Sequence, residues 1–146
     1  MERTISEKID PSHYRADACV VWCFDDRFSE LLQKLIAAKG WKRADIIKVA
    51  GGAKGLASPA SEAEREYLLD QIAKSVKLHQ PPTIALMVHA DCGAYGKKFS
   101  NDEEEFNFHK NELGQAGAAV GNFLSGKGLI AEIKKYYADF RGLVEI

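Results

Sequence analysis

Five residues of types that bind metals or hold protons stand in two short stretches of the sequence. Cys23, Asp25 and Arg27 lie in VVWCFDDR, and His89 and Cys92 lie in HADC. Two thiols and one imidazole are a ligand set that zinc favours at catalytic sites, where a fourth position stays open. The His-x-x-Cys spacing lets a single turn direct both side chains at one ion. We therefore predict that Cys23, His89 and Cys92 bind Zn²⁺.

Asp25 and Arg27 form a second candidate unit, two residues apart in the chain. In an extended backbone their side chains leave on the same side, so the guanidinium can hold the carboxylate in a charge-assisted pair. Two states of the metal site stay open. Asp25 is the fourth ligand and closes the site, or Arg27 holds Asp25 back and a water binds the metal.

The candidate residues follow segments with the patterns of strands. Residues 18–24 are almost wholly apolar, as in a strand buried on both faces of a parallel sheet. Residues 44–50 and 83–88 form two more predicted strands, followed by the loops GGAKG and HADCGAYGKK. Because sites in open α/β sheets form beyond the carboxyl ends of the strands, we expect these polar residues to meet at one edge.

Helical patterns separate the predicted strands. Residues 29–39 carry leucines and an isoleucine at helical spacing, and Gly40 is a natural stop. Residues 59–80 predict a longer helix, with Pro59 in its first turn and Ser61 in a capping box.

A third helix is predicted from Ser100, which has capping-box spacing to Glu103, to about Phe123. Its acidic first turn suits the helix dipole. Three glycines inside it destabilise a helix, so we expect their face to pack close to another backbone; a break near Gly114 is the competing interpretation. Residues 131–146 predict a last strand with a turn at Gly142.

The alternation of strands and helices predicts an α/β fold, with a mostly parallel sheet of about four to five strands and helices on its faces. The chain has 146 residues and a net charge of −1, which suits one domain over residues 1–146. Residues 1–16 are polar and predict an N-terminal arm with a short helix.

Composition and charge exclude several classes of function. A net charge near zero gives no general attraction to nucleic acid or anionic membranes, and no segment has the length and apolarity of a membrane span. Three cysteines and no signal-peptide pattern predict a cytoplasmic protein with free thiols. Cys19 lies in mid-strand among apolar neighbours and is expected in the core.

Two motifs in this order, CFDDR and HADC, resemble the paired C-x-D-x-R and H-x-x-C motifs of the β-class carbonic anhydrases. KVAGG stands where that family has a glycine-containing loop, and YYADFRGLVEI resembles its closing strand and turn, so the resemblance covers residues 18–146. It implies a β-carbonic-anhydrase-like fold and reversible hydration of CO2 to bicarbonate by zinc-bound hydroxide. It also implies a homodimer or higher homo-oligomer. By the same resemblance, Cys23, His89 and Cys92 would be the zinc ligands, and Asp25 and Arg27 would be the catalytic dyad.

In the implied mechanism, Arg27 keeps Asp25 ionised so that Asp25 orients the hydroxide toward CO2. Backbone N–H groups of Gly51, Gly52 and Gly93 are candidate donors to the bicarbonate oxygens. His109 and Tyr95 are candidate proton relays.

The chain also departs from the family pattern. Lys48-Val49-Ala50-Gly51 replaces the usual arginine-asparagine-alanine-glycine, and the glutamine and aromatic groups of the usual substrate pocket have no evident counterparts. Hydrolysis of COS or CS2 is therefore an alternative activity, and a non-catalytic zinc protein closed by Asp25 is another. A phosphate-binding cysteine loop at Cys92 is disfavoured, because Lys98 stands where an arginine is needed.

The remaining polar residues have simpler interpretations. Asp26 is expected to be solvated or to cap the following helix, and Asp91 is left unassigned. The acidic run at 102–105 is read as a solvated helix start. The histidines outside the motif are read as surface or packing residues: His13, His79 and His109.

Overall fold

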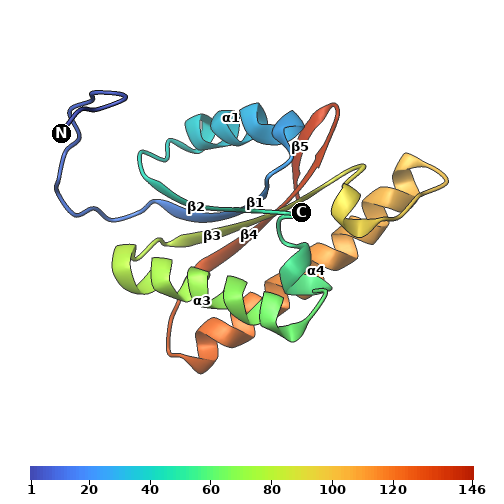
Figure 1. Ribbon diagram of the computed structural model, residues 1–146. Coiled ribbons are helices and arrows are strands. Elements are labelled where there is room, and N and C mark those ends of the chain that lie inside the picture. The colour runs from blue at the N-terminus through green and yellow to red at the C-terminus, as the bar shows by residue number, and fades with distance from the viewer.

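A five-stranded sheet forms the centre of the computed structural model, which describes residues 1–146 (Figure 1). The strand order is β2-β1-β3-β4-β5; the first four are parallel and β5 is antiparallel to β4. The strands are β1 (Ala18–Cys23), β2 (Ala44–Val49), β3 (Thr83–His89), β4 (Glu132–Asp139) and β5 (Gly142–Glu145). This is the mostly parallel α/β sheet that the sequence predicts.

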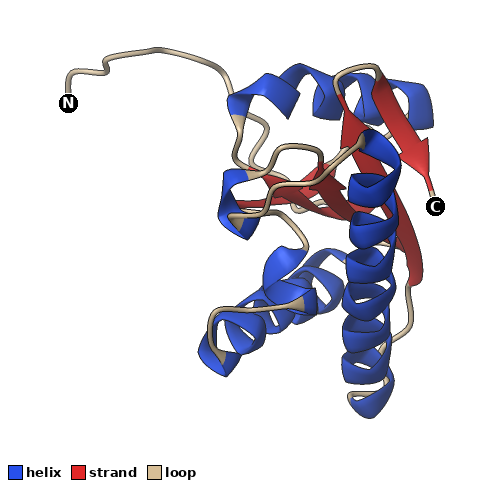
Figure 2. Cartoon of the chain, turned by 90° about the vertical axis from the view of Figure 1, so that its right-hand side faces the viewer, coloured by secondary structure: helices blue, strands red, loops and turns tan.

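Helices cover both faces of this sheet, but unequally. One face carries only α1 and the adjoining 3-10 turn η1, whereas α2, α3 and α4 pack on the other (Figure 1, Figure 2). The helices are α1 (Ser29–Lys39), α2 (Lys54–Ala57), α3 (Glu62–His79) and α4 (Asp102–Gly126), with 3-10 turns η1 (Asp26–Phe28) and η2 (Gly93–Tyr95). No helix combines the length and apolarity that a membrane crossing requires.

The ends of α1 and α3 follow from local chemistry. Gly40 ends α1 with φ of 66°, in the left-handed region that glycine enters at little cost. The Ser61 side chain accepts a hydrogen bond from the N–H of Glu64 and so caps α3. Pro59 therefore precedes this helix and does not lie in its first turn. The loop expected after β2 contains the short helix α2, which the sequence pattern did not indicate.

Helix α4 is continuous from Asp102 to Gly126, so the break considered near Gly114 is absent. Its cap is Asn101, whose side chain accepts from the N–H of Glu104, and not Ser100. The expected close backbone contact of its glycines is also absent. A Cβ at Gly117 or Gly121 would meet only side chains of β4, at 3.4 Å or more, and one at Gly114 would meet nothing within 4 Å.

The two ends of the chain differ from expectation. Residues 1–13 are exposed and form no helix, so only the arm of the N-terminal prediction is present (Figure 2). At the C-terminus, a hairpin of two strands replaces the single strand expected. Asp139 accepts hydrogen bonds from the backbone N–H groups of Arg141 and Gly142. The turn therefore lies at residues 140–141, directly before Gly142, which begins β5.

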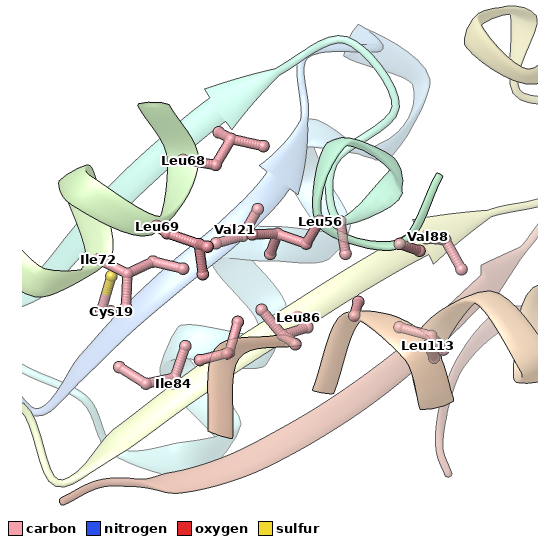
Figure 3. Packing of buried hydrophobic residues seen from close by; sticks show 14 of the residues in the cluster. Cys19, Val21, Leu56, Leu68, Leu69, Ile72, Ile84, Leu86, Val88 and Leu113 are labelled. Atoms are coloured by element: carbon pink, nitrogen blue, oxygen red, sulfur yellow. The ribbon is translucent and has the colours of Figure 1, made fainter. Parts of the chain in front are cut away.

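Strands β1 and β3 are packed on both faces, because their side chains belong to two apolar clusters on opposite sides of the sheet. Every residue of β1 is buried, and Cys19 and Val21 pack with α3 and β3 in the larger apolar cluster (Figure 3). On the opposite face, the Trp22 indole lies against η1 and donates to the carbonyl of Phe28 at 3.2 Å. The carboxyl ends of β1 and β3 are thereby fixed before any ligand is considered.

Asp45 joins three segments at the opposite end of the strands. Its carboxylate accepts from the Tyr14 hydroxyl at 2.7 Å, the Ser75 hydroxyl at 2.6 Å and His79 Nδ1 at 2.8 Å. Burial raises the pKa of this carboxyl, but the hydrogen bonds outweigh burial and hold the pKa below its usual range. His79 is thus a structural partner of Asp45, far from the residues predicted to bind metal.

Candidate metal centre

The three predicted ligands meet at the carboxyl edge of the sheet. Cys23 is the last residue of β1, His89 is the last residue of β3, and Cys92 follows in the loop after β3. One ligand atom from each lies within 4.8 Å of the other two, and all three residues are buried. The sequence therefore grouped the residues that the fold brings together.

His89 presents a lone pair to the two thiols. Its Nδ1 lies 2.8 Å from the carbonyl oxygen of Ala90, which can only accept, so the ring proton is on Nδ1. Nε2 is completely buried and has no hydrogen-bond partner. A buried nitrogen without a partner is costly, and an ion between it and the thiols would satisfy it.

The two thiols share a proton in the absence of an ion. A hydrogen bond from the Cys92 thiol, helped by the backbone N–H groups of Asp25 and Gly51, holds the pKa of Cys23 well below its usual range. The pKa of Cys92 is raised, first by that same bond and then by burial. Two thiolates and an imidazole are the soft donor set that suits Zn²⁺, so these residues fit that ion.

Arg27 holds Asp25 beside this group. The guanidinium donates from Nε to both carboxylate oxygens at 3.0 Å and from NH2 to Oδ2 at 2.6 Å. The side-chain hydrogen bonds of Arg27 lower the pKa of Asp25 to about 2, so the carboxyl is ionised at neutral pH. Asp25 Oδ2 lies 3.9 Å from His89 Nε2, close to the space that the ligands share.

The backbone between Asp25 and Arg27 is a turn, not the extended strand that the spacing indicated. Asp25 caps the 3-10 turn η1, and its side chain accepts the N–H of Arg27 at 3.1 Å. The predicted pair therefore forms, but for a different geometric reason. The Asp26 side chain is exposed and makes no hydrogen bond; Asp25 fills the capping role considered for it.

Asp91, which the sequence left unassigned, is the second anchor of Arg27. NH1 donates to Asp91 Oδ2 at 3.0 Å, and NH2 donates to the Asp91 carbonyl oxygen at 3.1 Å. The N–H of Asp91 donates in turn to Glu105 of α4 at 2.7 Å. No sequence signal identified these two acids, because the contacts join segments that only the folded sheet brings together.

Gly51 and Gly52 support the ligands from the loop after β2. Gly52 has φ of 57°, and a Cβ there would lie 2.4 Å from the Met87 carbonyl oxygen and 3.1 Å from the Cys23 nitrogen. Its N–H donates to Val49, while the N–H of Gly51 donates to Cys23. Gly93 stands in open space on the other side of Cys92. Bicarbonate binding by these glycines stays a prediction.

Aromatic and polar side chains lie behind the centre. Tyr95 and His109 meet edge to face at 4.9 Å. The Tyr95 hydroxyl is buried without a hydrogen-bond partner, and burial together with the charge of Glu112 raises its pKa. Burial lowers the pKa of His109 to about 4, so the ring is neutral at pH 7. His109 is thus a packed core residue, and its role as a relay stays a prediction.

Comparison with known proteins agrees with the motifs and the fold. The sequence model of the family described as "putative carbonic anhydrase" matches residues 14–141. No curated protein sequence matches the chain.

Solved structures of carbonic anhydrases share its fold. The enzyme of Streptococcus mutans is 16% identical, with a TM-score of 0.51 over 97% of this chain and 87% of that chain. A β-carbonic anhydrase of Trichomonas vaginalis is 17% identical, with a TM-score of 0.53 over 97% and 87%. β-Carbonic anhydrases of Sordaria macrospora give 13% identity and a TM-score of 0.50 over 91% and 81%.

The family match extends over most of the chain and includes both motifs at the carboxyl edge of the sheet. The structural matches cover 91–97% of this chain and 81–87% of the solved chains, and show a shared fold. On this evidence the chain belongs to the β-carbonic anhydrase family.

Proposed function

We propose that the protein is a zinc-dependent carbonic anhydrase that hydrates CO2 reversibly to bicarbonate. The observation that carries the proposal is the convergence of Cys23, His89 and Cys92 on one point, with the Arg27-held carboxylate of Asp25 beside it. Membership of the family supports the reaction, and the donor set supports the metal.

Zn²⁺ bound by these three residues would supply a Lewis acid that makes hydroxide available near neutral pH. The chain's own residues do the rest. His89 is fixed in the tautomer that offers Nε2, because Nδ1 is committed to Ala90. Two thiolates offset the charge of the ion, which makes a well-placed hydrogen-bond acceptor more valuable for orienting the attacking oxygen.

Asp25 supplies that acceptor. As an ionised carboxylate it can only accept, so a hydroxide in the shared space must point its hydrogen at Asp25 and its lone pair elsewhere. CO2 is linear and apolar, and offers only its carbon to that lone pair. Arg27 keeps Asp25 ionised and keeps it from moving onto the ligands.

We also propose that the protein works as a homodimer or a higher homo-oligomer in the cytoplasm. The β-carbonic anhydrases of Sordaria macrospora are tetrameric, and two large aromatic side chains beside this centre, Phe24 and Phe140, are mostly exposed in the single chain. All three cysteines are free thiols, as a reducing compartment requires. Sedimentation analysis of the purified protein tests the assembly; a monomer at micromolar concentration would contradict it.

The test of the activity compares the wild-type protein with Asp25→Asn. We expect about one zinc per chain in both, and a hydration rate in the variant lower by about 10²-fold, because an amide can turn its N–H toward the attacking oxygen. Stopped-flow hydration of CO2 and metal analysis of the same samples measure this. An unchanged rate in Asp25→Asn would remove Asp25 from the mechanism. Wild-type protein that hydrolyses COS or CS2 but leaves CO2 untouched would overturn the proposed substrate.

A further inference from the structure

Asp91 has a backbone conformation that requires support. It lies between the two ligands of the HADC loop and has φ of 52°, in the left-handed region, which Asp enters more readily than most non-glycine residues but still at a cost in free energy. Gln80 is the only other non-glycine residue with positive φ, and it is the C-cap of α3, where that conformation is usual. No helix end accounts for the conformation of Asp91.

Glu105 of α4 provides the support. One of its carboxylate oxygens, Oε1, accepts the N–H of Asp91 at 2.7 Å. His109 Nε2 lies 3.8 Å from the same oxygen, too far for a hydrogen bond, and the Glu105 side chain is 16% exposed. The carboxylate is therefore directed inward at a single backbone donor, unlike its exposed acidic neighbours in the first turn of α4.

The position of Asp91 is passed on to Asp25 through Arg27. The guanidinium lies between the two acids: it donates to the side chain and carbonyl of Asp91, and to both oxygens of Asp25. If Asp91 relaxed to negative φ, its carbonyl and side chain would turn away from the guanidinium. Arg27 would then hold Asp25 without its own second anchor. Asp25 Oδ2 already lies 3.9 Å from His89 Nε2, so a small movement would bring the carboxylate onto the metal position.

We propose that Glu105 is a positioning residue of the metal centre. By fixing Asp91 in the left-handed conformation it keeps Arg27 on Asp25, and so keeps Asp25 beside the ion and off the fourth coordination position. Glu105 makes no contact with the ligands; it acts through Asp91 and Arg27. The inference rests on the proposed function only in taking Cys23, His89 and Cys92 as the ligands.

The experiment uses the protein loaded with Co²⁺, whose visible spectrum reports the fourth ligand, and azide as the probe. Wild-type protein should show a spectral change on addition of azide. Glu105→Ala should keep its cobalt but lose at least about tenfold in azide affinity, because Asp25 then occupies the fourth position. Asp25→Asn in the Glu105→Ala background should restore the response, since it removes the competing carboxylate.

Two further variants separate positioning from general damage. Glu105→Gln retains an oxygen acceptor for the Asp91 N–H and should respond to azide as the wild type does. Glu103→Ala removes an exposed acid from the same helix turn, where it has no hydrogen-bond partner, and should also behave as wild type. Azide affinity within twofold of wild type in cobalt-loaded Glu105→Ala would overturn the proposal. Loss of the response in Glu105→Gln would overturn it as well, whether or not Glu105→Ala holds cobalt.

The readout does not depend on turnover of CO2. A wild-type protein that binds azide but hydrates no CO2 would refute the proposed activity and leave this test intact. An unaltered azide response in Glu105→Ala would refute the positioning role and leave the proposed activity intact.

Discussion

At the scale of single residues, the two cysteines of β1 show how position decides chemistry. Both are buried, but burial raises the pKa of Cys19 to about 11, whereas the hydrogen bond from Cys92 holds the pKa of Cys23 well below its usual range. Cys19 lies among apolar side chains, and Cys23 faces Cys92 and His89. The sequence separated these roles correctly in assigning Cys19 to the core; the ligand role of Cys23 stays a prediction.

Metal content tests that separation directly. Cys92→Ala should reduce bound zinc from about one per chain to near zero, because two ligands cannot hold the ion against water. Cys19→Ala is the matched control, since it removes an equally buried thiol and should leave the zinc in place. Metal analysis after gel filtration measures both. Full zinc in Cys92→Ala would show that the ion binds elsewhere.

At the scale of elements, the long patterns were predictable and the short ones were not. Strand β1 and helix α1 have the predicted bounds to within a residue, because β1 is a short apolar run rich in β-branched residues and α1 has apolar residues at helical spacing that end at Gly40. Helix α2 and strand β5 have four residues each and exist through contacts with α4 and β4. Such tertiary contacts leave no periodic trace in the sequence.

The same limit explains what was missed at the candidate site. The predicted ligands can be recognised by residue type, because Cys and His are common metal ligands. They also lie at the end of a predicted strand or directly after one. Asp91 and Glu105 are ordinary acids that meet only when α4 folds back over the carboxyl edge of the sheet. Glu105 even belongs to a run that reads as a solvated helix start.

The loop after β2 gives a prediction at this scale. Gly52→Ala should destabilise the fold by the roughly 1–2 kcal/mol of a left-handed non-glycine residue, plus a further cost of pushing the Met87 carbonyl away from 2.4 Å. Gly40→Ala isolates the first part, because its φ is 66° and its surroundings are open. Urea unfolding of both variants measures the difference. Equal losses would mean that the close approach of Gly52 to β3 contributes nothing.

At the scale of the whole molecule, the two ends of the sheet have different tasks. The carboxyl ends of the strands carry the candidate centre, and the opposite ends carry Asp45, which ties the segment at Tyr14 and helix α3 to the edge strand. The carboxyl ends hold the candidate metal ligands, whereas the hydrogen bonds at the opposite ends join separate segments of the fold. We therefore expect low pH to act on Asp25 at the carboxyl ends of the strands and on Asp45 at the opposite ends.

The Asp45 contacts predict part of the acid unfolding. The folded pKa of Asp45 lies below its unfolded value, so its stabilising contribution is complete above the unfolded pKa and is lost as pH falls through the folded one. Asp45→Asn should lower the free energy of unfolding at pH 7 by about 1–3 kcal/mol and flatten its dependence between about pH 5 and 2. Denaturant titrations across that range measure it. Asp26→Asn, an exposed and unpaired acid, is the control, and an equally flattened curve there would contradict the assignment.

The strand order has a consequence for how a metal ion would reach the proposed site. Parallel neighbours cannot pair through a tight turn, and β1 and β3, which are adjacent in the sheet, are separated along the chain by α1, β2, α2 and α3. Cys23 and His89 are therefore brought together by the pairing of two distant strands and not by a local turn. Two apolar clusters already hold the sheet together, so we do not expect a metal ion to be needed for folding as it is in small zinc-organised domains. If the proposed site binds Zn²⁺, we therefore expect the folded apoprotein to take up the ion without refolding, through access to the carboxyl edge of the sheet.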